Sequence, residues 1–576
     1  MPSPRWSESI RTHYLSGASN QFVLHGNVHD RLLLPGEEGT TGNASIGNLS
    51  DYLIGHQLRK FDLVLSYELG AGLRVERGEE LFRKLRPADD LPGEPAKAIA
   101  YLDYVLRFLI NLRNLQPEAP STPSPSGAEV VTETARPLAG RNFHVAFVLK
   151  GADLIFPRTQ NTLNYQLASI ASVVRAWSRE THFLEQNLAV FLLTENLNDL
   201  HPLLAANPRA ALMDIDMPDA AELHEAFGFF TKKYPKALAN FTDDPELPAE
   251  RLAGATLGSI ESLLKTREHA GAPLVESDLA ELKKDLVEKD SQGLIEFVEP
   301  TRTLDDVFGS EAVKAWMRQD VALWRQNDLE AMPMGYLLCG PVGTGKTYLV
   351  ECLAGEAGVP VVKMKNFRDK WVGSTEGNLE KIFNLLHALG RCIVFIDEAD
   401  QALGSRDAGS GDSGVSGRVY SMIAKEMSDT RNRGRILWIL ASSRPDLIEV
   451  DLKRPGRVDV KIPLFPSHDP LEGYQLIRAL GKRHQLGLPK EPPAAIIPLL
   501  PELVTPGAAE SIAIKVYRLV KTRQVDAVEA LRDCLDEYQN PVPKDVMDFQ
   551  IGIAVREASD LDFVPAVFRE QFQASR

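Results

Sequence analysis

Positive charge is outnumbered by negative charge in this sequence. Asp and Glu outnumber Lys and Arg by 79 to 64 among 576 residues, and the formal net charge is -15. Phosphate backbones repel a chain of this sign at long range, and no strongly basic patch offsets the repulsion. We therefore do not expect a nucleic acid partner, and a nucleic-acid translocase is a disfavoured alternative.

Cysteines are few, and long apolar runs are absent. The four cysteines lack metal-type spacing and lie in apolar stretches, which is typical of reduced, buried thiols and predicts a cytoplasmic protein. No signal pattern opens the chain, and no apolar run approaches the roughly 18 residues of a membrane helix, so we expect no membrane segment. The H-E-x-x-H pattern is also missing, which excludes a zinc protease of that type.

What is present is typical of soluble globular proteins, with 44% hydrophobic and 25% charged residues. The length predicts several packed units with more than one core. Short β-branched runs alternate with longer helical patterns, which predicts an α/β fold of parallel sheets wrapped by helices. The clearest runs are residues 145–149, 188–193, 392–396 and 436–440. Stretches rich in Pro, Gly or Ser predict flexible segments at residues 35–48, 116–140 and 404–417.

The two halves of the chain share a pattern of strands. Lys150 and Asn196 follow the first two runs at a spacing of 46 residues, and Asp397 and Ser443 follow the other two at the same spacing. This ordered match favours an internal duplication with an offset of about 247 residues. The alternative is two unrelated α/β domains.

A phosphate-binding loop follows the strand-like segment at residues 336–339 and precedes a helical pattern. Its glycines allow consecutive backbone N–H groups to face phosphates, Lys346 reaches the β- and γ-phosphates, and the Thr347 hydroxyl binds Mg²⁺. The loop consists of Gly340, Pro341, Val342, Gly343, Thr344, Gly345, Lys346 and Thr347.

Asp397 and Glu398 form an acidic pair directly after the buried run at residues 392–396. A carboxylate at the end of such a strand can hold the water molecules bound to Mg²⁺, and its neighbour can activate the attacking water. We assign Asp397 to the metal and Glu398 to the role of general base.

Residues 304 to about 510 resemble the AAA branch of the AAA+ ATPases, which contains the valosin-containing-protein unfoldase, the membrane-bound AAA proteases and the microtubule-severing enzymes. The segments that carry the resemblance are LDDVFG, GPVGTGKT, KWVGSTEGNLEKIF, IVFIDEAD, ASSRPDLI and KRPGRVD. The layout, with a degenerate first half, is similar to that of uncharacterised cyanobacterial and plastid AAA proteins. The resemblance implies a P-loop sheet with a helical lid, and ATP and Mg²⁺ as cofactors.

The same resemblance assigns further residues around the nucleotide. Tyr348 follows the phosphate loop, and Gly507 and Ala508 lie where the lid closes. Ser443 stands where the family has a sensor Asn, so we expect water to be positioned indirectly and hydrolysis to be slow or partner-dependent. The adenine pocket would be lined by Asp306, Val307, Phe308 and Gly309.

Arg454 and Arg457 match the arginine fingers that enter the site of a neighbouring subunit. Such a finger contributes about 10³ to 10⁵ in rate, so the resemblance implies a homo-oligomeric ring, expected to be a hexamer. A surface basic loop is the alternative for this segment.

A segment of four residues matches the aromatic pore loop with which the family grips an extended polypeptide, which implies a protein client. The alternative is that Trp371 caps a core cluster. The residues are Lys370, Trp371, Val372 and Gly373, and the stretch 404–417 would supply a second pore loop.

The first half lacks this chemistry. Gly26 is kept, but Arg31, Leu32 and Leu33 stand where the loop has Gly345, Lys346 and Thr347, and Lys150 and Gly151 replace the acidic pair. We predict a degenerate AAA-like module at 1–218, its helical lid and a linker at 219–299, the ATPase subdomain at 300–467, and a lid with C-terminal helices at 468–576.

These features together predict an ATP-driven motor that remodels a protein client, with the first half as a platform for partners. The alternative is an ATP-gated assembly or signalling scaffold that threads nothing.

Overall fold

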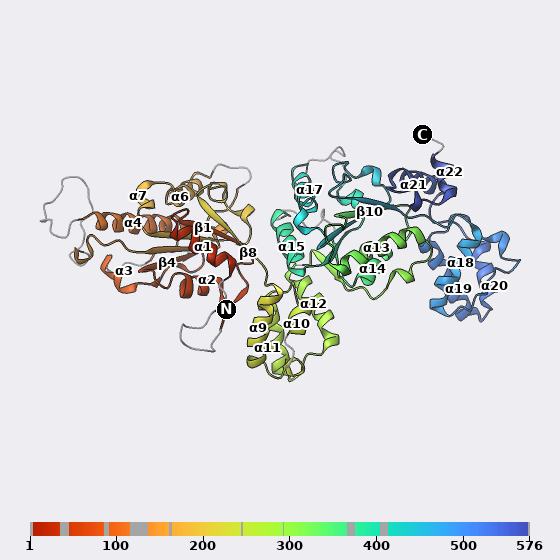
Figure 1. The fold of residues 1–576 in the computed structure, drawn as a ribbon, viewed down its shortest axis with the longest axis horizontal. Coiled ribbons are helices and arrows are strands. Elements are labelled where there is room, and N and C mark those ends of the chain that lie inside the picture. The colour runs from red at the N-terminus through yellow and green to blue at the C-terminus, as the bar shows by residue number, and fades with distance from the viewer. Residues whose placement is uncertain are drawn as a thin grey trace. The chain divides into compact units, whose positions relative to one another are not determined.

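The computed structural model describes residues 4–34, 45–85, 91–115, 136–159, 164–242, 246–291, 293–365, 375–403 and 413–573. The chain divides into two compact units, one of residues 1–279 with 376–388 and one of residues 280–375 with 389–576. Figure 1 gives the labels used below. The predicted pore-loop residues Lys370 to Gly373 lie outside the described residues.

The first unit is built on a six-stranded sheet. Its order is β5 (Gly72–Arg77), β4 (Leu63–Glu68), β6 (Val145–Lys150), β7 (Leu188–Leu193), β1 (Gln21–Gly26) and β8 (Ala210–Ile215). All pairs are parallel except β4 with β5. A separate hairpin joins β2 (Arg31–Leu34) to β3 (Ser45–Asn48).

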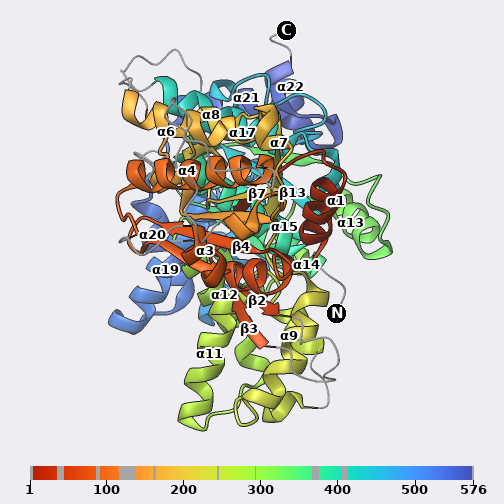
Figure 2. The same ribbon diagram turned by 90° about the vertical axis from the view of Figure 1, so that its left-hand side faces the viewer.

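Helices cover both faces of this sheet. Side chains of alternate strand residues point into two cores, one shared with α4 and α6 and the other with α1 and α2. Figures 1 and 2 show helices on both sides of the strands. The first unit's helices are α1 (Arg5–Leu15), α2 (Leu49–Tyr52), α3 (Glu79–Leu85), α4 (Pro95–Asn114), α5 (Ala152–Ile155), α6 (Tyr165–Ala176), α7 (Thr181–Leu184), α8 (Pro202–Ala205), α9 (Ala220–Lys233), α10 (Glu246–Arg251) and α11 (Leu257–Ala270).

The second unit has a sheet of the same design. Its order is β9 (Ile295–Val298), β11 (Val361–Met364), β12 (Cys392–Ile396), β13 (Ile436–Ser442), β10 (Gly335–Cys339) and β14 (Val460–Pro463). Only β9 runs antiparallel to its neighbour. Position by position, β4, β6, β7, β1 and β8 correspond to β11, β12, β13, β10 and β14.

Most of the remaining helices cover this sheet or form a lid, whereas residues 376–388 of α15 belong to the first unit. The lid has its own core, formed by α18, α19 and α20. The helices are α12 (Glu276–Asp290), which spans the division between the units, α13 (Glu311–Gln326), α14 (Lys346–Ala357), α15 (Thr375–Leu389), α16 (Ala399–Ala402), α17 (Ser413–Met427), α18 (Pro470–Gly481), α19 (Pro506–Arg523), α20 (Ala527–Asp536), α21 (Lys544–Glu557) and α22 (Ala566–Gln573).

The four predicted runs are all strands, and the shared strand order is what a duplication predicts. The ends of the predicted flexible segments are wrong. Residues 45–48 form β3, residues 136–138 form a 3₁₀ turn, and residues 413–417 begin α17. Residues 295–298, which the proposed boundaries place in a linker, pair with β11 instead.

Asp30 joins the sheet of the first unit to its helical bundle. Its carboxylate accepts hydrogen bonds from the backbone N–H groups of Leu257 (3.0 Å) and Gly258 (2.8 Å), at the first turn of α11. The Thr256 hydroxyl accepts the next donor, from Ser259, at 3.2 Å. A helix leaves its first N–H groups without internal partners, so this carboxylate, which is only 7% exposed, satisfies two of them.

We expect Asp30→Ala to leave the buried Leu257 amide and the partly buried Gly258 amide without these partners. A loss of this kind destabilises by about 1–3 kcal/mol. The measurement is amide hydrogen exchange by mass spectrometry of peptides covering residues 257–260, together with thermal unfolding. Asp285→Ala, at an exposed position of α12, is the matched control. Unchanged exchange at the start of α11 would contradict the role of Asp30.

Candidate functional site

The phosphate loop runs from β10 to α14, as the sequence predicts. Gly340 has φ of +143°, and a Cβ atom there would lie 2.1 Å from the Leu464 carbonyl oxygen, just past β14. Gly343 (φ +85°) and Gly345 (φ +82°) also adopt conformations that disfavour side chains. The loop can pass this close to Leu464 only because glycine occupies position 340.

Lys346 is held inside its own loop. Its Nζ donates to the carbonyl oxygens of Gly340 (2.9 Å) and Pro341 (3.0 Å). Burial lowers the pKa of Lys346 to about 8, since desolvation disfavours the charged form. An anion such as phosphate would restore the charged form.

Thr347 and Asp397 meet at the carboxyl end of the sheet. The Thr347 hydroxyl donates to Asp397 Oδ2 at 3.1 Å, and Lys363 Nζ lies 3.7 Å from the same oxygen. A hydroxyl and a carboxylate are the hard oxygen ligands that Mg²⁺ prefers. The residues therefore fit a Mg²⁺ ion.

Glu398 sits in a strained turn. It has φ of 49° and ψ of 46°, directly before the four-residue helix α16, and its side chain is exposed. In the first unit Gly151 has nearly the same conformation (φ 64°, ψ 51°) before the four-residue helix α5. The left-handed turn is thus shared by both sheets, and only the second carries a carboxylate on it, at a conformational cost that recurs at functional sites. Lys150, beside Gly151, pairs with Glu76 instead (3.6 Å).

The lid reaches the phosphate loop at Gly507. Its backbone N–H donates to the Gly343 carbonyl at 3.0 Å. The Ala508 N–H donates to the Thr505 hydroxyl oxygen at 3.2 Å. Thr505 was missed from the sequence, although a Thr directly before Pro506 is a recognisable helix N-cap.

The segment predicted to bind adenine lies beside Tyr348. The Tyr348 hydroxyl is 3.4 Å from the Asp306 carbonyl oxygen, and the Tyr348 ring has the Arg302 guanidinium at 5.0 Å and that of Arg483 at 5.5 Å. Lys314 Nζ donates to the Val307 carbonyl at 3.1 Å. The cation–π contacts and Lys314 were not predicted, because they join residues far apart in the sequence.

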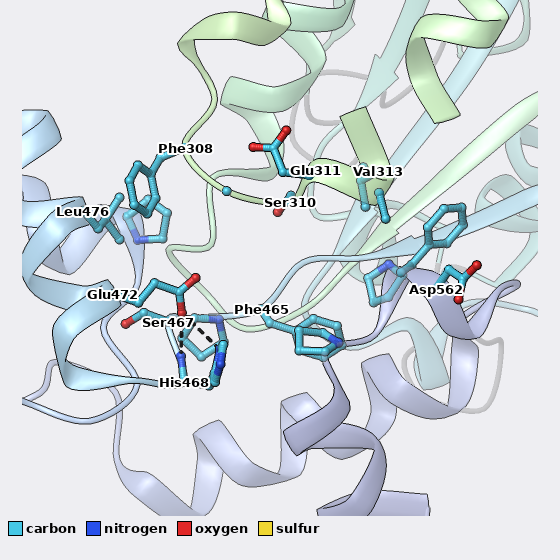
Figure 3. Close-up of a pocket in the computed structure, with 17 residues that line it drawn as sticks. Phe308, Ser310, Glu311, Val313, Phe465, Ser467, His468, Glu472, Leu476 and Asp562 are labelled. Atoms are coloured by element: carbon cyan, nitrogen blue, oxygen red, sulfur yellow. Dashed lines mark hydrogen bonds and ion pairs between the residues drawn. The ribbon is translucent and has the colours of Figure 1, made fainter. Parts of the chain in front are cut away.

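A cavity adjoins this segment. Phe308, before α13, lies next to Leu476 of α18, and the dashed contacts join His468 and Glu472 (Figure 3). The His468 to Glu472 separation is 3.0 Å. Gly309 and Pro506 also line the cavity. Phe308 and Gly309 are therefore on a cavity wall shared with the lid.

At the end of β13, Ser442 makes two hydrogen bonds through its side chain. Its hydroxyl donates to Asp400 and accepts from the Arg444 N–H at 2.9 Å. Ser443, the predicted sensor, is the next residue and is half-buried. The last acidic residue of the IDEAD segment therefore has a structural partner that the sequence did not indicate.

The two arginines differ in environment. The side chain of Arg454 is 59% exposed and lies 3.1 Å from Asp451, whereas that of Arg457 is 10% exposed. Arg457 donates to Ser428 (2.7 Å) and to the Asp451 backbone oxygen (3.0 Å). Arg457 is therefore engaged by its own subunit, and Arg454 is available to another molecule.

A parallel sheet with a phosphate loop between strand and helix, and an acidic pair at the end of a nearby strand, defines a P-loop nucleoside triphosphatase. Two family descriptions match the chain. "AAA+ chaperone, N-terminal Rossmann-like domain" covers residues 1–216, and "ATPase family associated with various cellular activities (AAA)" covers residues 336–465.

The chain is similar to several known proteins, each over only part of its length. The chain is 29% identical over 268 residues to a cell division cycle protein 48 homolog of Archaeoglobus fulgidus, covering 44% of this chain and 34% of the relative. It is 29% identical to the human peroxisomal ATPase PEX6, covering 40% of this chain and 24% of the relative. It is 35% identical to the ATP-dependent zinc metalloprotease FtsH of Marinobacter nauticus, covering 29% and 28%. The matched regions thus span about a third or less of these relatives.

The chain belongs to the AAA+ ATPases, a family of ATP hydrolases. This confirms the predicted α/β fold with a P-loop sheet. The four cysteines are free and buried, as predicted, and burial raises the pKa of Cys339 to about 12. No group of three His, Cys, Asp or Glu side chains suited to a metal occurs in the described residues, and no described helix has the length and apolar character of a membrane span.

We expect nucleotide affinity to fall as pH rises above about 8. The pKa of Lys346 is about 8 in the free protein, and bound phosphates raise it, so binding takes up a proton above this pH. Affinity is fully present below pH 8 and falls by up to about tenfold per pH unit above it. The measurement is titration with a fluorescent ADP analogue between pH 7 and 9.5.

Lys346→Arg is the control, since a guanidinium stays charged throughout this range. A wild-type pH profile as flat as that of the arginine variant would refute this titration.

Proposed function

We propose that the protein couples hydrolysis of Mg²⁺-bound ATP to the remodelling of a protein client, as a hexameric ring with the first half as a platform for partners. The observation that carries the nucleotide chemistry is the contact of the Thr347 hydroxyl with Asp397 at 3.1 Å, beside the phosphate loop. Remodelling is supported by the resemblance of residues 370–373 to the aromatic pore loop. The domain boundaries and the cytoplasmic location stay predictions.

Each group in the site has a defined task in this proposal. Lys346 exchanges its contacts with loop carbonyls for the nucleotide phosphates. Thr347 and Asp397 would hold Mg²⁺, which offsets phosphate charge. Glu398 takes the proton of the attacking water, and its exposed position gives that water access. Ser443 positions water less directly than an Asn would.

Arg454 completes the site of a neighbouring subunit. It is the more exposed arginine, and its pairing with Asp451 is at the surface, where ion pairs contribute little and exchange readily. Arg457 instead fixes the loop that carries Arg454, through Ser428 and Asp451.

We expect Glu398→Gln to slow hydrolysis strongly while ATP binding is retained, because only the base is lost. The rate should fall by about 10²–10⁴.

Trp371→Ala should hydrolyse ATP normally and fail to process a client. The assays are phosphate release, and retention of fluorescein-labelled casein by the ATP-bound Glu398→Gln protein.

Three results separate the alternatives. If Trp371→Ala handles casein as the wild type does, the scaffold function is favoured over threading. Salt-sensitive binding of single-stranded DNA or RNA would support a translocase. Failure of the wild type to bind Mg·ATP under all assembly conditions would overturn the proposal.

The arginines give a separate test. Arg454→Ala should lower the turnover number by about 10³–10⁵ without changing the melting temperature, because the side chain is exposed. Arg457→Ala should lower the melting temperature as well, since it removes buried hydrogen bonds. Arg518→Ala, on the exposed surface of α19, is the control. Equal effects of the two finger variants on stability would contradict the distinction.

A further inference from the structure

Helix α21 returns from the lid to the ATPase sheet. It follows the lid helices α18–α20 in the chain, but Figure 1 shows it with α22 near β10 and away from them. Its apolar face packs with Phe465, Leu503 and α22. Three polar or aromatic contacts then link this one helix to three loops of the ATPase unit.

The first contact is with the phosphate loop. Gln550 Oε1 accepts a hydrogen bond from the Val342 N–H at 3.3 Å, and Gln550 is only 6% exposed. Val342 lies between Gly340 and Gly343, where the loop has no regular secondary structure to satisfy its amides. The Gln550 side chain therefore holds the phosphate loop at Val342.

The second contact is with the loop that follows β13. The Arg444 guanidinium lies 5.0 Å from the centre of the Phe549 ring and is held by Asp446 at 2.8 Å. The Arg444 backbone N–H donates to Ser442, which is bonded to Asp400 of the acidic segment. The same turn of α21 thus touches the phosphate loop and the sensor region.

The third contact is at the C-terminal end of α21. Glu557 lies 2.6 Å from Lys453 Nζ and 3.0 Å from Lys461 Nζ, and the Lys453 side chain is 9% exposed. Burial acts to raise the pKa of Glu557, but hydrogen bonds from both lysines hold it below its usual value. Lys453 directly precedes Arg454 in the chain, so this ion pair anchors the arginine-bearing loop.

Gln550 and Glu557 are seven residues apart, which places them on the same face of the helix about 10 Å from each other. A displacement of the helix at one contact therefore reaches the other, because a helix of this length moves as a rigid body.

We propose that α21 is a strut that couples the phosphate loop to the arginine loop within one subunit. Gln550 positions the phosphate loop, Glu557 positions the loop that carries Arg454, and nucleotide occupancy at the first shifts the placement of the second. The inference rests on the proposed function, since Arg454 needs a neighbouring site to enter. Coupling of this kind is reciprocal, so a change at Glu557 also changes nucleotide affinity.

The test is a double-mutant cycle in the full-length protein, with Gln550→Met, Glu557→Gln and the double variant. Gln550→Met keeps the side-chain length and removes the acceptor. The measurements are ADP affinity by titration with a fluorescent ADP analogue, and kcat and KM for ATP.

Gln550→Met should weaken ADP binding about 3- to 10-fold, the equivalent of one hydrogen bond, with a small effect on kcat. Glu557→Gln should lower kcat and also weaken ADP binding. In the double variant, ADP affinity should match that of Gln550→Met alone, because the connection is already broken.

Two results would overturn the strut: an unchanged ADP affinity in Glu557→Gln, or effects of the two substitutions that simply multiply. Glu570→Gln, the same replacement at an exposed position of α22, is the control and should change neither parameter. If Glu557→Gln fails to fold, Lys453→Gln breaks the same ion pair from the other side. A wild type that neither binds nor hydrolyses ATP defeats the proposed function, whereas a wild type that hydrolyses ATP, with variants that behave additively, defeats only the strut.

Discussion

The backbone of the phosphate loop is the constraint on which the ATPase unit depends. A loop that turns through glycines satisfies only part of its backbone polar groups internally, and neighbouring elements satisfy others. The Gly343 carbonyl accepts from Gly507 of the lid, the Val342 N–H donates to Gln550 of α21, and Gly340 passes against the Leu464 carbonyl beside β14. Lys346 donates to carbonyl oxygens of its own loop, so a phosphate can replace these contacts without disturbing another element. The loop is therefore placed by the sheet, the lid and the C-terminal helix together.

The two sheets show how one architecture can keep or lose this chemistry. They share strand order, an antiparallel edge strand and a left-handed turn at Gly151 and Glu398. In the ATPase unit a backbone hydrogen bond joins the lid to the phosphate loop, at the edge of the sheet where a nucleotide would bind. In the first unit Asp30 supplies a carboxylate to the first turn of α11, so that connection needs no ligand. A hairpin, β2 with β3, follows β1 where the phosphate loop follows β10.

The two arginines differ in how far their side chains are buried. Arg454 and Arg457 are equivalent in the motif, yet Asp451 and Ser428 bind Arg457 inside the subunit and leave Arg454 at the surface. Nothing in the spacing of KRPGR distinguishes them, because the difference arises from a contact distant in the sequence. Asp451 pairs with both arginines, whereas the Ser428 hydroxyl, just past α17, accepts a hydrogen bond from Arg457. The same holds for Ser442 and Ser443, where packing against Asp400 gives the first serine the hydrogen bonds.

The α/β fold, the family, the four strands and the phosphate loop with its acidic pair can be predicted from the amino-acid sequence, because each depends on local periodicity or on residues adjacent in the chain. Which side chains support that loop depends on packing between distant segments. Lys363 and Gln550 carry no local signal of their role at the loop, since each acts through a contact with a residue distant in the sequence. The edge strand β9 was missed for the same reason: its four residues become a strand only by pairing with β11.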